Sequence, residues 1–437
     1  MRAVFWFRRD LRLEDNTGLA ECLNQAEEII PVFIFERPLL QQLEGPAERL
    51  GFLLDCLKRL DDKLKKKGSR LYCFHGTAEE IFPYLIETGK VEAVFTNTGH
   101  SWTGSGTEAS VARISREKAI KFFSFNDSLL VEPAEIGARR VFGAFFKAWL
   151  KTLSQKPLTL KKEPSRLRTP GTGWPELKDI LPDLAPRKNH HWSPDYAERR
   201  LQTFDFSSYA ERRNRLDEDG TSRLSVAIRF GLISVRQVFS RARKFLPEDS
   251  QFVKELAWRE FWYHIRYHFP WTEALEFQEK RRGLKWLNRE EDILAVEEAR
   301  TGYPIIDAAI NQLKEEGWMH NRARMVVASF VTKDLLIDWR IGEKLFKKYL
   351  LDYDEVVNTG NWQWSASVGA DPRPFRVFNP QLQAARFDPE CRYQKKYLPE
   401  LKKISCQRIH SLDLPAYHQP IVDHRAATVR ARKFYLG

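Results

Sequence analysis

The first third of this 437-residue chain alternates between short apolar runs and longer segments of helical periodicity. The apolar runs have the length and the aromatic and β-branched content of buried strands, and they lie at 3–7, 29–35, 70–75, 91–97 and 119–126. Residues 47–68 have apolar side chains at spacings of three and four and end in glycine, which predicts a helix. Strands that alternate with helices form parallel, doubly wound sheets, so we expect this α/β architecture.

The remainder of the chain has a different pattern. Residues 155–195 are rich in Pro, Lys and Asp and show little periodicity, which predicts a long connection over the surface. Helical periods then dominate, at 251–269, 303–317 and 324–351. We therefore predict an α/β plus all-α protein, with an α/β domain over 1–130, a linker over 131–196 and a helical domain over 197–437.

The charge balance points to a polyanionic partner. The sequence contains 71 Lys and Arg and 59 Asp and Glu, which gives a net charge of +12. Such an excess favours nucleic acid, although a merely basic surface would also produce it.

The sequence also indicates a cellular compartment and excludes some classes of site. No apolar run approaches the roughly 20 residues that span a bilayer, and no signal-peptide pattern follows Met1, so we expect a cytoplasmic protein without membrane contact. The five cysteines are scattered without a CxxC, which predicts reduced thiols and no zinc site.

Two motifs have the spacing of a dinucleotide site and of a zinc site, but a structural role explains each of them better. Residues 104–109, GSGTEA, match a dinucleotide pattern, with Asp127 at nearly the expected acidic spacing. They do not follow a strand directly, so we interpret them as a flexible loop. His264 and His268 have the spacing of a zinc pair, but no glutamate lies between them and no third ligand is evident, so we predict structural histidines. The pair His190 and His191 is assigned no role.

Three further segments combine residue types that suit nucleotides. In GTSRLS (220–225), Thr221 and Ser222 can cap a helix while Arg223 adds a cation, which describes either an anion site or an ordinary cap. Residues 257–269 interleave aromatic and basic side chains, as a base-stacking face or a buried aromatic stripe would. Residues 352–364, DYDEVVNTGNWQW, are polar and aromatic where a helical bundle would use leucine.

Six motifs in order carry a resemblance to a known family. They are VFWFRRDLRLEDN (4–16), TSRLS, WREF, GYPIIDAAINQL, WMHNRARMVVASFVTKDLLIDWR and NTGNWQWSAS, and the similarity extends to about FRVFNP (375–380). Together they resemble the photolyase/cryptochrome flavoproteins, and within them the class I-like repair enzymes for cyclobutane pyrimidine dimers. The resemblance implies a light-driven lyase that splits these dimers in damaged DNA, acting as a monomer without an obligate protein partner.

The resemblance also implies a U-shaped FAD in the helical domain. Its diphosphate and surroundings would be held by Tyr209, Arg213, Thr221, Ser222, Arg223, Leu224 and Ser225. The cavity would be lined by Glu255, Trp258, Asn321 and Arg324, while Asp352 and Asp354 would face the isoalloxazine and Asn358 would lie against its N5. We expect Arg324 to pair with Asp352.

The same resemblance assigns the lesion site. Trp258 and Trp364 would be the walls around a flipped dimer, Met325 would contact it, and Glu255 and Asn321 would hydrogen-bond the pyrimidine edges. The DNA backbone would be bound by Arg259, Arg322 and Arg376. Six-four photolyases carry histidines at the positions of Asn321 and Met325, so we do not expect their chemistry.

Electron supply and light harvesting complete the expectations. Trp362, Trp339 and Trp286 match the relay that photoreduces the flavin, although three core tryptophans would be the ordinary explanation. A second chromophore could be a flavin, a deazaflavin or a folate, and Thr98 after Asn97 departs from the acidic residue of folate-binding relatives.

Two other functions stay open at this point. A cryptochrome-type blue-light receptor would ordinarily carry a long C-terminal tail, whereas Gly437 ends this sequence soon after the helical domain. A nucleotide-dependent oxidoreductase would rest on GSGTEA and the sheet alone.

Overall fold

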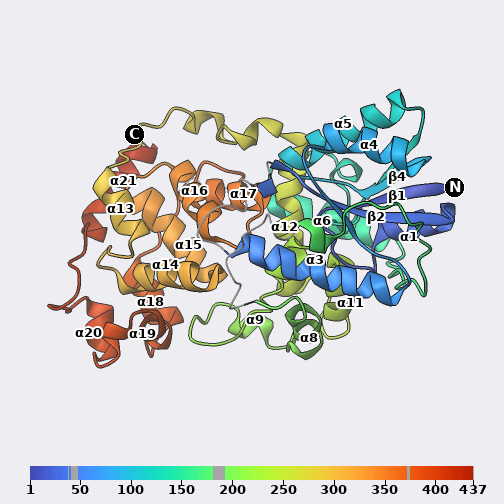
Figure 1. The fold of residues 1–437 in the computed structure, drawn as a ribbon. Coiled ribbons are helices and arrows are strands. Elements are labelled where there is room, and N and C mark those ends of the chain that lie inside the picture. Colours follow the sequence, from blue (N-terminus) through green and yellow to red (C-terminus); the bar gives the residue numbers. More distant parts are fainter. Residues whose placement is uncertain (38, 41–47, 181–191, 372–374, 437) are drawn as a thin grey trace. The chain divides into compact units, whose positions relative to one another are not determined.

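A computed structural model describes residues 1–37, 39–40, 48–180, 192–371 and 375–436 (Figure 1). The chain forms two compact units that alternate along the sequence. The first unit comprises 1–132, 151–204 and 222–248, and the second comprises 133–150, 205–221 and 249–437. The predicted domain boundaries at 130 and 196 stay predictions, and part of the predicted linker, including His190 and His191, lies outside the described residues.

The first unit contains a five-stranded parallel sheet in the order β3-β2-β1-β4-β5. Val4 in the central strand pairs with Ile30 on one side and Val94 on the other. The strands are β1 (Arg2–Phe7), β2 (Glu28–Phe35), β3 (Tyr72–His75), β4 (Ala93–Asn97) and β5 (Lys121–Phe125). All five predicted strands and the doubly wound topology are therefore confirmed.

Helices cover both faces of this sheet. Figure 1 shows α4 (Ala78–Gly89) and α5 (Trp102–Glu117) above the strands, and α1 (Thr17–Gln25) and α3 (Arg49–Lys66) below them. Further helices of this unit are α7 (Leu177–Ile180), α8 (Tyr196–Thr203), α10 (Ser225–Arg229) and α11 (Val235–Arg243). The predicted helix at 47–68 is confirmed as α3.

The prediction of a flexible loop at GSGTEA was wrong, because these residues lie in the first half of α5. Ser101 is the N-cap of this helix, and its side chain accepts a hydrogen bond of 3.0 Å from the Gly104 amide. A Cβ at Gly104 would lie 2.7 Å from Ser101 Oγ, so the glycine permits the cap. The first glycine of the motif thus serves a helix terminus.

Asp127, the acidic residue that the dinucleotide pattern required, belongs to a buried ion-pair network. Its carboxylate lies 2.5 Å from Arg12 Nη2 and 2.7 Å from Arg236 Nη2, and Arg236 Nε lies 2.9 Å from Asp15. Burial opposes ionisation of Asp127, but the charges of Arg12 and Arg236 outweigh it and hold its pKa at about 2. The DLRLED segment therefore ties the strand ends to the start of α11.

We expect Asp127 to make this unit sensitive to acid. Its pKa of about 2 in the folded protein lies below the value of about 3.9 in an unfolded chain, so its contribution is complete above about pH 5 and is lost as the pH falls toward 2. The full contribution is about 3 kcal/mol, because the two pKa values differ by about two units and one pKa unit corresponds to about 1.4 kcal/mol.

Hydrogen exchange of β1 and β4, followed from pH 7 to pH 3, measures this effect. In Asp127→Asn the opening free energy of these strands is lower at pH 7 and falls less on acidification than in the wild type. Asp55→Asn removes an exposed carboxylate of α3 and is the control. Equal acid sensitivity of the wild type and Asp127→Asn would contradict the prediction.

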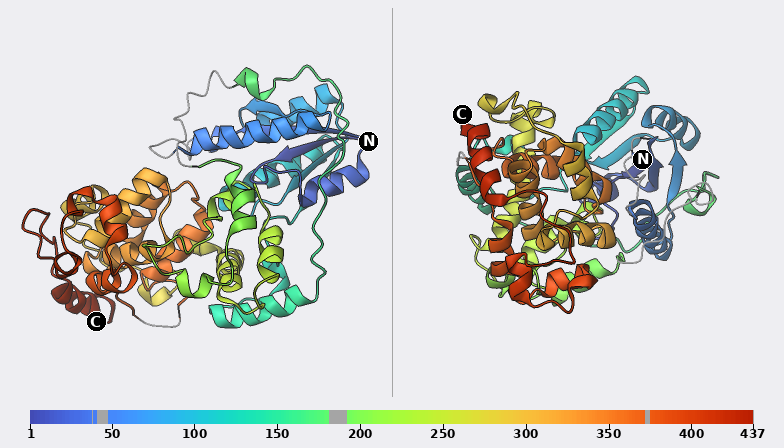
Figure 2. Two further views of the ribbon diagram at one scale, coloured as in Figure 1. Left: turned by 90° about the horizontal axis from the view of Figure 1, so that it is seen from below. Right: turned by 90° about the vertical axis from the view of Figure 1, so that its left-hand side faces the viewer.

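The second unit is helical, and its yellow and orange helices gather into one bundle in Figure 2. Its longer helices are α6 (Phe142–Ser154, which begins in this unit), α12 (Gln251–His268), α13 (Glu290–Glu297), α14 (Pro304–Glu316), α15 (Asn321–Ser329), α16 (Trp339–Tyr349), α17 (Glu355–Ser365), α18 (Pro380–Phe387) and α21 (His424–Leu436). Short helices are η1 (Pro133–Glu135), α9 (Tyr209–Arg212), η3 (Pro270–Glu273), η4 (Glu279–Arg281), α19 (Arg392–Tyr397), η6 (Pro399–Leu401) and α20 (Cys406–Ser411).

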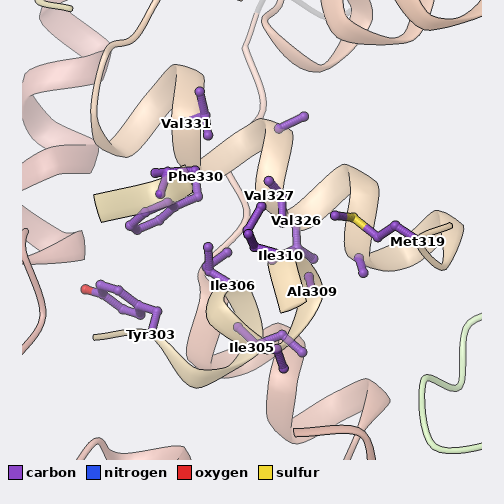
Figure 3. Close-up of a cluster of buried hydrophobic side chains, with 14 of the residues drawn as sticks. Tyr303, Ile305, Ile306, Ala309, Ile310, Met319, Val326, Val327, Phe330 and Val331 are labelled. Carbon is purple, nitrogen blue, oxygen red and sulfur yellow. The ribbon is translucent and has the colours of Figure 1, made fainter. Parts of the chain in front are cut away.

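The core of this unit is built around α14 and α15. Figure 3 shows Ile306 and Ile310 of α14 beside Val326 and Val327 of α15, all of them buried. The predicted helical stretch 324–351 is divided by a π-helical turn, η5 (Phe330–Asp334), and by a short break before α16. Asp338 caps α16 by accepting a hydrogen bond of 2.9 Å from the Arg340 amide, so a new helix starts there.

The five cysteines are free thiols, as predicted. Within the described ranges, no helix combines the length and the apolarity that crossing a bilayer requires.

Candidate active site

Two tryptophans from different helices meet edge to face in the second unit. Trp258 lies on α12 and Trp364 on α17, and the centroids of their rings are 6.3 Å apart with an interplanar angle of 72°. Arg376 lies over the Trp364 ring at 4.7 Å and is held by Asp371 at 3.0 Å. Both tryptophans are half-buried, so their rings remain accessible. The structure thus brings together the two predicted walls and one predicted backbone-binding arginine.

Phe142, which the sequence analysis missed, supports one of these walls, Trp258. Its ring stacks on Trp258 with a centroid separation of 3.8 Å and an interplanar angle of 3°. Phe142 comes from the start of α6, far from α12 in sequence, and no local pattern connects the two residues. The stack fixes the orientation of the Trp258 indole, because rotation of the ring would break the contact.

A cluster of positive charge lies near the start of α12 and of α15. Arg213 forms an ion pair with Glu255, which also accepts a hydrogen bond of 2.6 Å from Gln251. Arg322 donates to Asn214 Oδ1 at 2.8 Å and lies over the Phe387 ring at 4.4 Å. Burial, with Arg213 and Arg386 nearby, lowers the pKa of Arg322 to about 10. Three arginines, Arg213, Arg322 and Arg386, thus gather near one glutamate, and this excess of positive charge suits a phosphate group.

Three further residues predicted to contact DNA, Asn321, Met325 and Arg259, make contacts within the protein. Asn321 is exposed, and its Nδ2 lies 3.7 Å from the sulfur of Met325 one turn later. Arg259 lies over the Tyr263 ring at 5.0 Å. The roles of these three residues toward a lesion or a DNA backbone stay predictions.

The expected ion pair of Arg324 and Asp352 is present. Arg324 Nη2 lies 2.8 and 3.1 Å from the two carboxylate oxygens of Asp352, and Arg324 Nε donates to the Met319 carbonyl at 2.8 Å. The Asp352 side chain is buried, and Arg324 provides the opposite charge beside it. The pair joins the segment before α17 to the start of α15.

Asp354 has a structural duty that the sequence analysis missed. It is the N-cap of α17, where Oδ1 accepts from the amides of Val356 and Val357 at 3.1 Å. Its Oδ2 accepts a hydrogen bond of 2.5 Å from the hydroxyl of Tyr263 on α12. Asp354 therefore fixes the start of the helix that carries Asn358, Trp362 and Trp364.

Asn358 is held by Glu343, a partly buried acid that sequence reasoning did not find. Asn358 Nδ2 lies 3.0 Å from Glu343 Oε1, and the hydroxyl of Tyr353 donates to the same oxygen at 2.8 Å. Burial raises the pKa of Glu343. In this hydrogen bond Asn358 donates through its NH2 group, so its amide oxygen points away from Glu343. A charged residue on the apolar face of α16 was the one available signal in the sequence.

The capping prediction for Thr221 and Ser222 was wrong. The helix α10 begins at Ser225, and its N-cap is Leu224, which makes no side-chain cap bond. Ser222 instead accepts a hydrogen bond of 3.2 Å from Arg200 through its carbonyl. Residues 222–225 belong to the first unit, whereas Tyr209 and Arg213 belong to the second, so their shared role at a diphosphate stays a prediction.

The three predicted relay tryptophans belong to one apolar region. Trp362 and Trp339 are buried in the core of the second unit, and the partly buried Trp286 packs against it. A Cβ at Gly342 would lie 2.2 Å from the Trp362 ring, so α16 can approach this indole only through a glycine. The arrangement fits a redox relay and equally fits a packed core.

The two histidines of α12 are structural, as predicted. His264 Nε2 accepts from the Arg139 amide at 2.9 Å, and His268 Nε2 lies 2.9 Å from the Ile136 carbonyl. Burial and the neighbouring His268 lower the pKa of His264 to about 3, which keeps it neutral. In the part of the chain that the structure describes, no three His, Cys, Asp or Glu side chains form a metal site.

Both the N-terminal and the C-terminal part of the chain match models of photolyase families. Residues 3–165 match the DNA photolyase family, and residues 252–436 match the FAD binding domain of DNA photolyase. Deoxyribodipyrimidine photo-lyase from Synechococcus sp. is 36% identical and is covered over 96% of its length by 99% of this chain. The enzyme of the same name from Escherichia coli is 33% identical, with 99% of this chain and 98% of the relative covered.

Solved structures agree with these relatives. An archaeal photolyase from Sulfolobus tokodaii with two FAD molecules is 32% identical, with a TM-score of 0.90 and full coverage of both chains. A bacterial class III photolyase from Agrobacterium tumefaciens is 33% identical, with a TM-score of 0.88 over 100% of this chain and 97% of that one. A Synechocystis cryptochrome at 24% identity and a TM-score of 0.89 shares the fold. Sequence and structure together therefore place this chain in the DNA photolyase family, with the FAD-binding domain in its C-terminal half.

Proposed function

We propose that this protein is a light-driven DNA repair enzyme, a deoxyribodipyrimidine photo-lyase that splits cyclobutane pyrimidine dimers. The observation that carries the proposal is the pair of half-buried tryptophans, Trp258 and Trp364, which meet edge to face beside Arg376. Flipping a dimer out of DNA costs a few kcal/mol, and aromatic stacking returns roughly 1–3 kcal/mol per base. A damaged site stacks poorly in the duplex, so this balance selects damage in any sequence context.

The residues of the second unit fit a flavin nucleotide. Arg213 and the residues around it would hold the diphosphate, and Asp352 and Asn358 would meet the polar edge and N5 of the ring. FAD, when bound and reduced, supplies the electron that splits the dimer after light absorption. Glu343 orients the Asn358 amide so that its oxygen faces away from Glu343, and an oxygen acceptor suits the N–H that a reduced flavin carries at N5.

The DNA backbone would be bound without reading its sequence. Arg259, Arg322 and Arg376 are the candidate contacts, and phosphate contacts fix the register while leaving the base identity open. The net charge of +12 agrees with a DNA partner. Cytoplasmic location, a monomeric state and a second, light-harvesting chromophore of flavin, deazaflavin or folate type stay part of this proposal.

Anaerobic illumination of the reduced protein with a thymine-dimer oligonucleotide tests the function. Near-ultraviolet light restores the thymines, and a dark sample does not. If bound flavin is reduced and excited but no dimer is split, the signalling function takes the place of repair and the roles of Trp258 and Trp364 must be reassigned.

A further inference from the structure

A buried carboxylate lies beside the middle member of the tryptophan relay. Trp339 Nε1 donates a hydrogen bond of 3.2 Å to Glu276 Oε1, and these two residues are only 2% and 4% exposed. Trp362 has different surroundings, because its indole N–H is buried and has no hydrogen-bond partner in the described part of the chain. The two indoles therefore experience different electrostatic potentials.

Gln363 holds the loop that carries Glu276. This buried side chain accepts from the Phe277 amide at 2.9 Å and donates to the carbonyls of Thr272 and Leu275 at 2.9 and 3.0 Å. The backbone is thus pinned on both sides of Glu276. Gln363, which lies between the relay residue Trp362 and the lesion-site residue Trp364, thus positions the carboxylate of Glu276.

Arg340 brings an opposing charge to the same indole. Its guanidinium carbon lies 4.6 Å from the centroid of the Trp339 ring, and its Nη1 lies 2.9 Å from Glu276 and 3.2 Å from Asp338. A cation over a neutral indole is favourable, but the same cation repels a ring that has lost an electron. Glu276 attracts that oxidised ring, so the two residues act in opposite directions.

We propose that Glu276 tunes the relay by stabilising the positive charge that Trp339 acquires when it gives an electron to Trp362. The inference rests on the proposed function and on the assignment of Trp362, Trp339 and Trp286 as a relay, in which Trp362 would give an electron to bound, light-excited FAD. One electron passes from the neutral Trp339 ring to the oxidised Trp362 ring, so that Trp362 becomes neutral and Trp339 becomes a radical cation. No bond forms or breaks in this step.

The indole proton stays on Trp339 Nε1. Burial raises the pKa of Glu276, but hydrogen bonds from Arg340, from its own backbone and from Trp339 outweigh this and hold the pKa below its ordinary value. Such a carboxylate is a poor proton acceptor, so it acts through its charge. Glu276 is therefore a positioning residue of the relay.

Nuclear magnetic resonance of the indole groups tests the contact independently of light. With 15N-labelled tryptophan, the Trp339 signal is assigned by its loss in Trp339→Phe. We expect this signal to move upfield in Glu276→Ala, and to stay near its wild-type position in Glu276→Gln, which keeps an oxygen acceptor. An unchanged signal in Glu276→Ala would overturn the proposal.

Laser flash photolysis of the FAD-bound protein tests the charge. Loss of one nearby charge changes the stability of the oxidised Trp339 enough to alter its lifetime by about tenfold. We expect a shorter lifetime in Glu276→Gln, a longer one in Arg340→Gln and near wild-type behaviour in Glu276→Asp. Changes in the same direction for the first two variants would show a packing effect and overturn the proposal.

Trp339→Phe separates this inference from the assignment of the relay. If Trp339→Phe removes the long-lived oxidised state while Glu276→Gln leaves its lifetime unchanged, the relay stands and the role of Glu276 is overturned. If photoreduction persists in Trp339→Phe, the relay assignment fails and the role of Glu276 fails with it.

Discussion

Replacement of Trp258 by alanine weakens binding to dimer-containing DNA by about tenfold to a hundredfold and leaves binding to undamaged DNA nearly unchanged. The loss follows from the stacking free energy of roughly 1–3 kcal/mol per base, which only a flipped lesion gains at this ring. Undamaged DNA is held through phosphate contacts, which do not involve Trp258. Competition binding of labelled oligonucleotides with and without one thymine dimer, at a fixed salt concentration, measures both affinities.

The matched control is Trp271→Ala. Trp271 lies in η3 of the same unit, is 42% exposed and packs edge to face on Phe269 with the ring centroids 5.5 Å apart. Its loss should leave both affinities unchanged. Trp258→Phe should give an intermediate result, because a smaller ring can still stack on Phe142. Equal losses on damaged and undamaged DNA in Trp258→Ala would contradict the lesion-pocket assignment.

Replacement of Trp362 by phenylalanine abolishes photoreduction of the bound flavin but preserves most of the repair by enzyme that was reduced chemically beforehand. A phenyl ring is far harder to oxidise than an indole, whereas it keeps much of the contact with Phe346 and Gly342. Absorbance of the flavin during anaerobic illumination with an external electron donor measures the first effect, and thymine restoration measures the second.

Trp149→Phe is the control for this experiment. Trp149 is also fully buried, and its indole donates to Glu260 at 2.7 Å, outside the relay. It should photoreduce like the wild type even if its stability falls. Loss of repair in prereduced Trp362→Phe would show that Trp362 is needed for packing, and the redox role would then have to be given up.

The outcome for the sheet shows how far local sequence information reaches. Each strand was evident because a buried parallel strand needs an unbroken apolar run, and this requirement is local. The error at GSGTEA has a local cause of another kind. The N-cap, Ser101, lies within the three residues before this motif. Its hydrogen bond to the Gly104 amide stabilises the start of the helix although the first turns contain two glycines.

The predicted site residues have partners that come mostly from distant segments of the chain. Resemblance named Asn358 and Asp352, and the structure supplies the partners, Glu343 at 3.0 Å and Arg324 at 2.8 Å. Only the second partner was foreseen. Asp354 and Gln363 both lie in the segment 352–364. Asp354 caps α17 through nearby amides, but its bond to Tyr263 and the bonds of Gln363 to the segment after α12 join parts of the chain that are far apart in sequence.

The sequence by itself determined the five strands, the helical second half, the charge and the family, because periodicity, composition and ordered motifs are properties of neighbouring residues. Tertiary structure alone decided that Asp127 is an ion-pair partner, that Phe142 supports Trp258 and that Glu276 lies beside Trp339. The physical reason is burial. A polar or aromatic side chain far along the chain becomes a partner only when folding removes both groups from water, and no local pattern records which groups will meet.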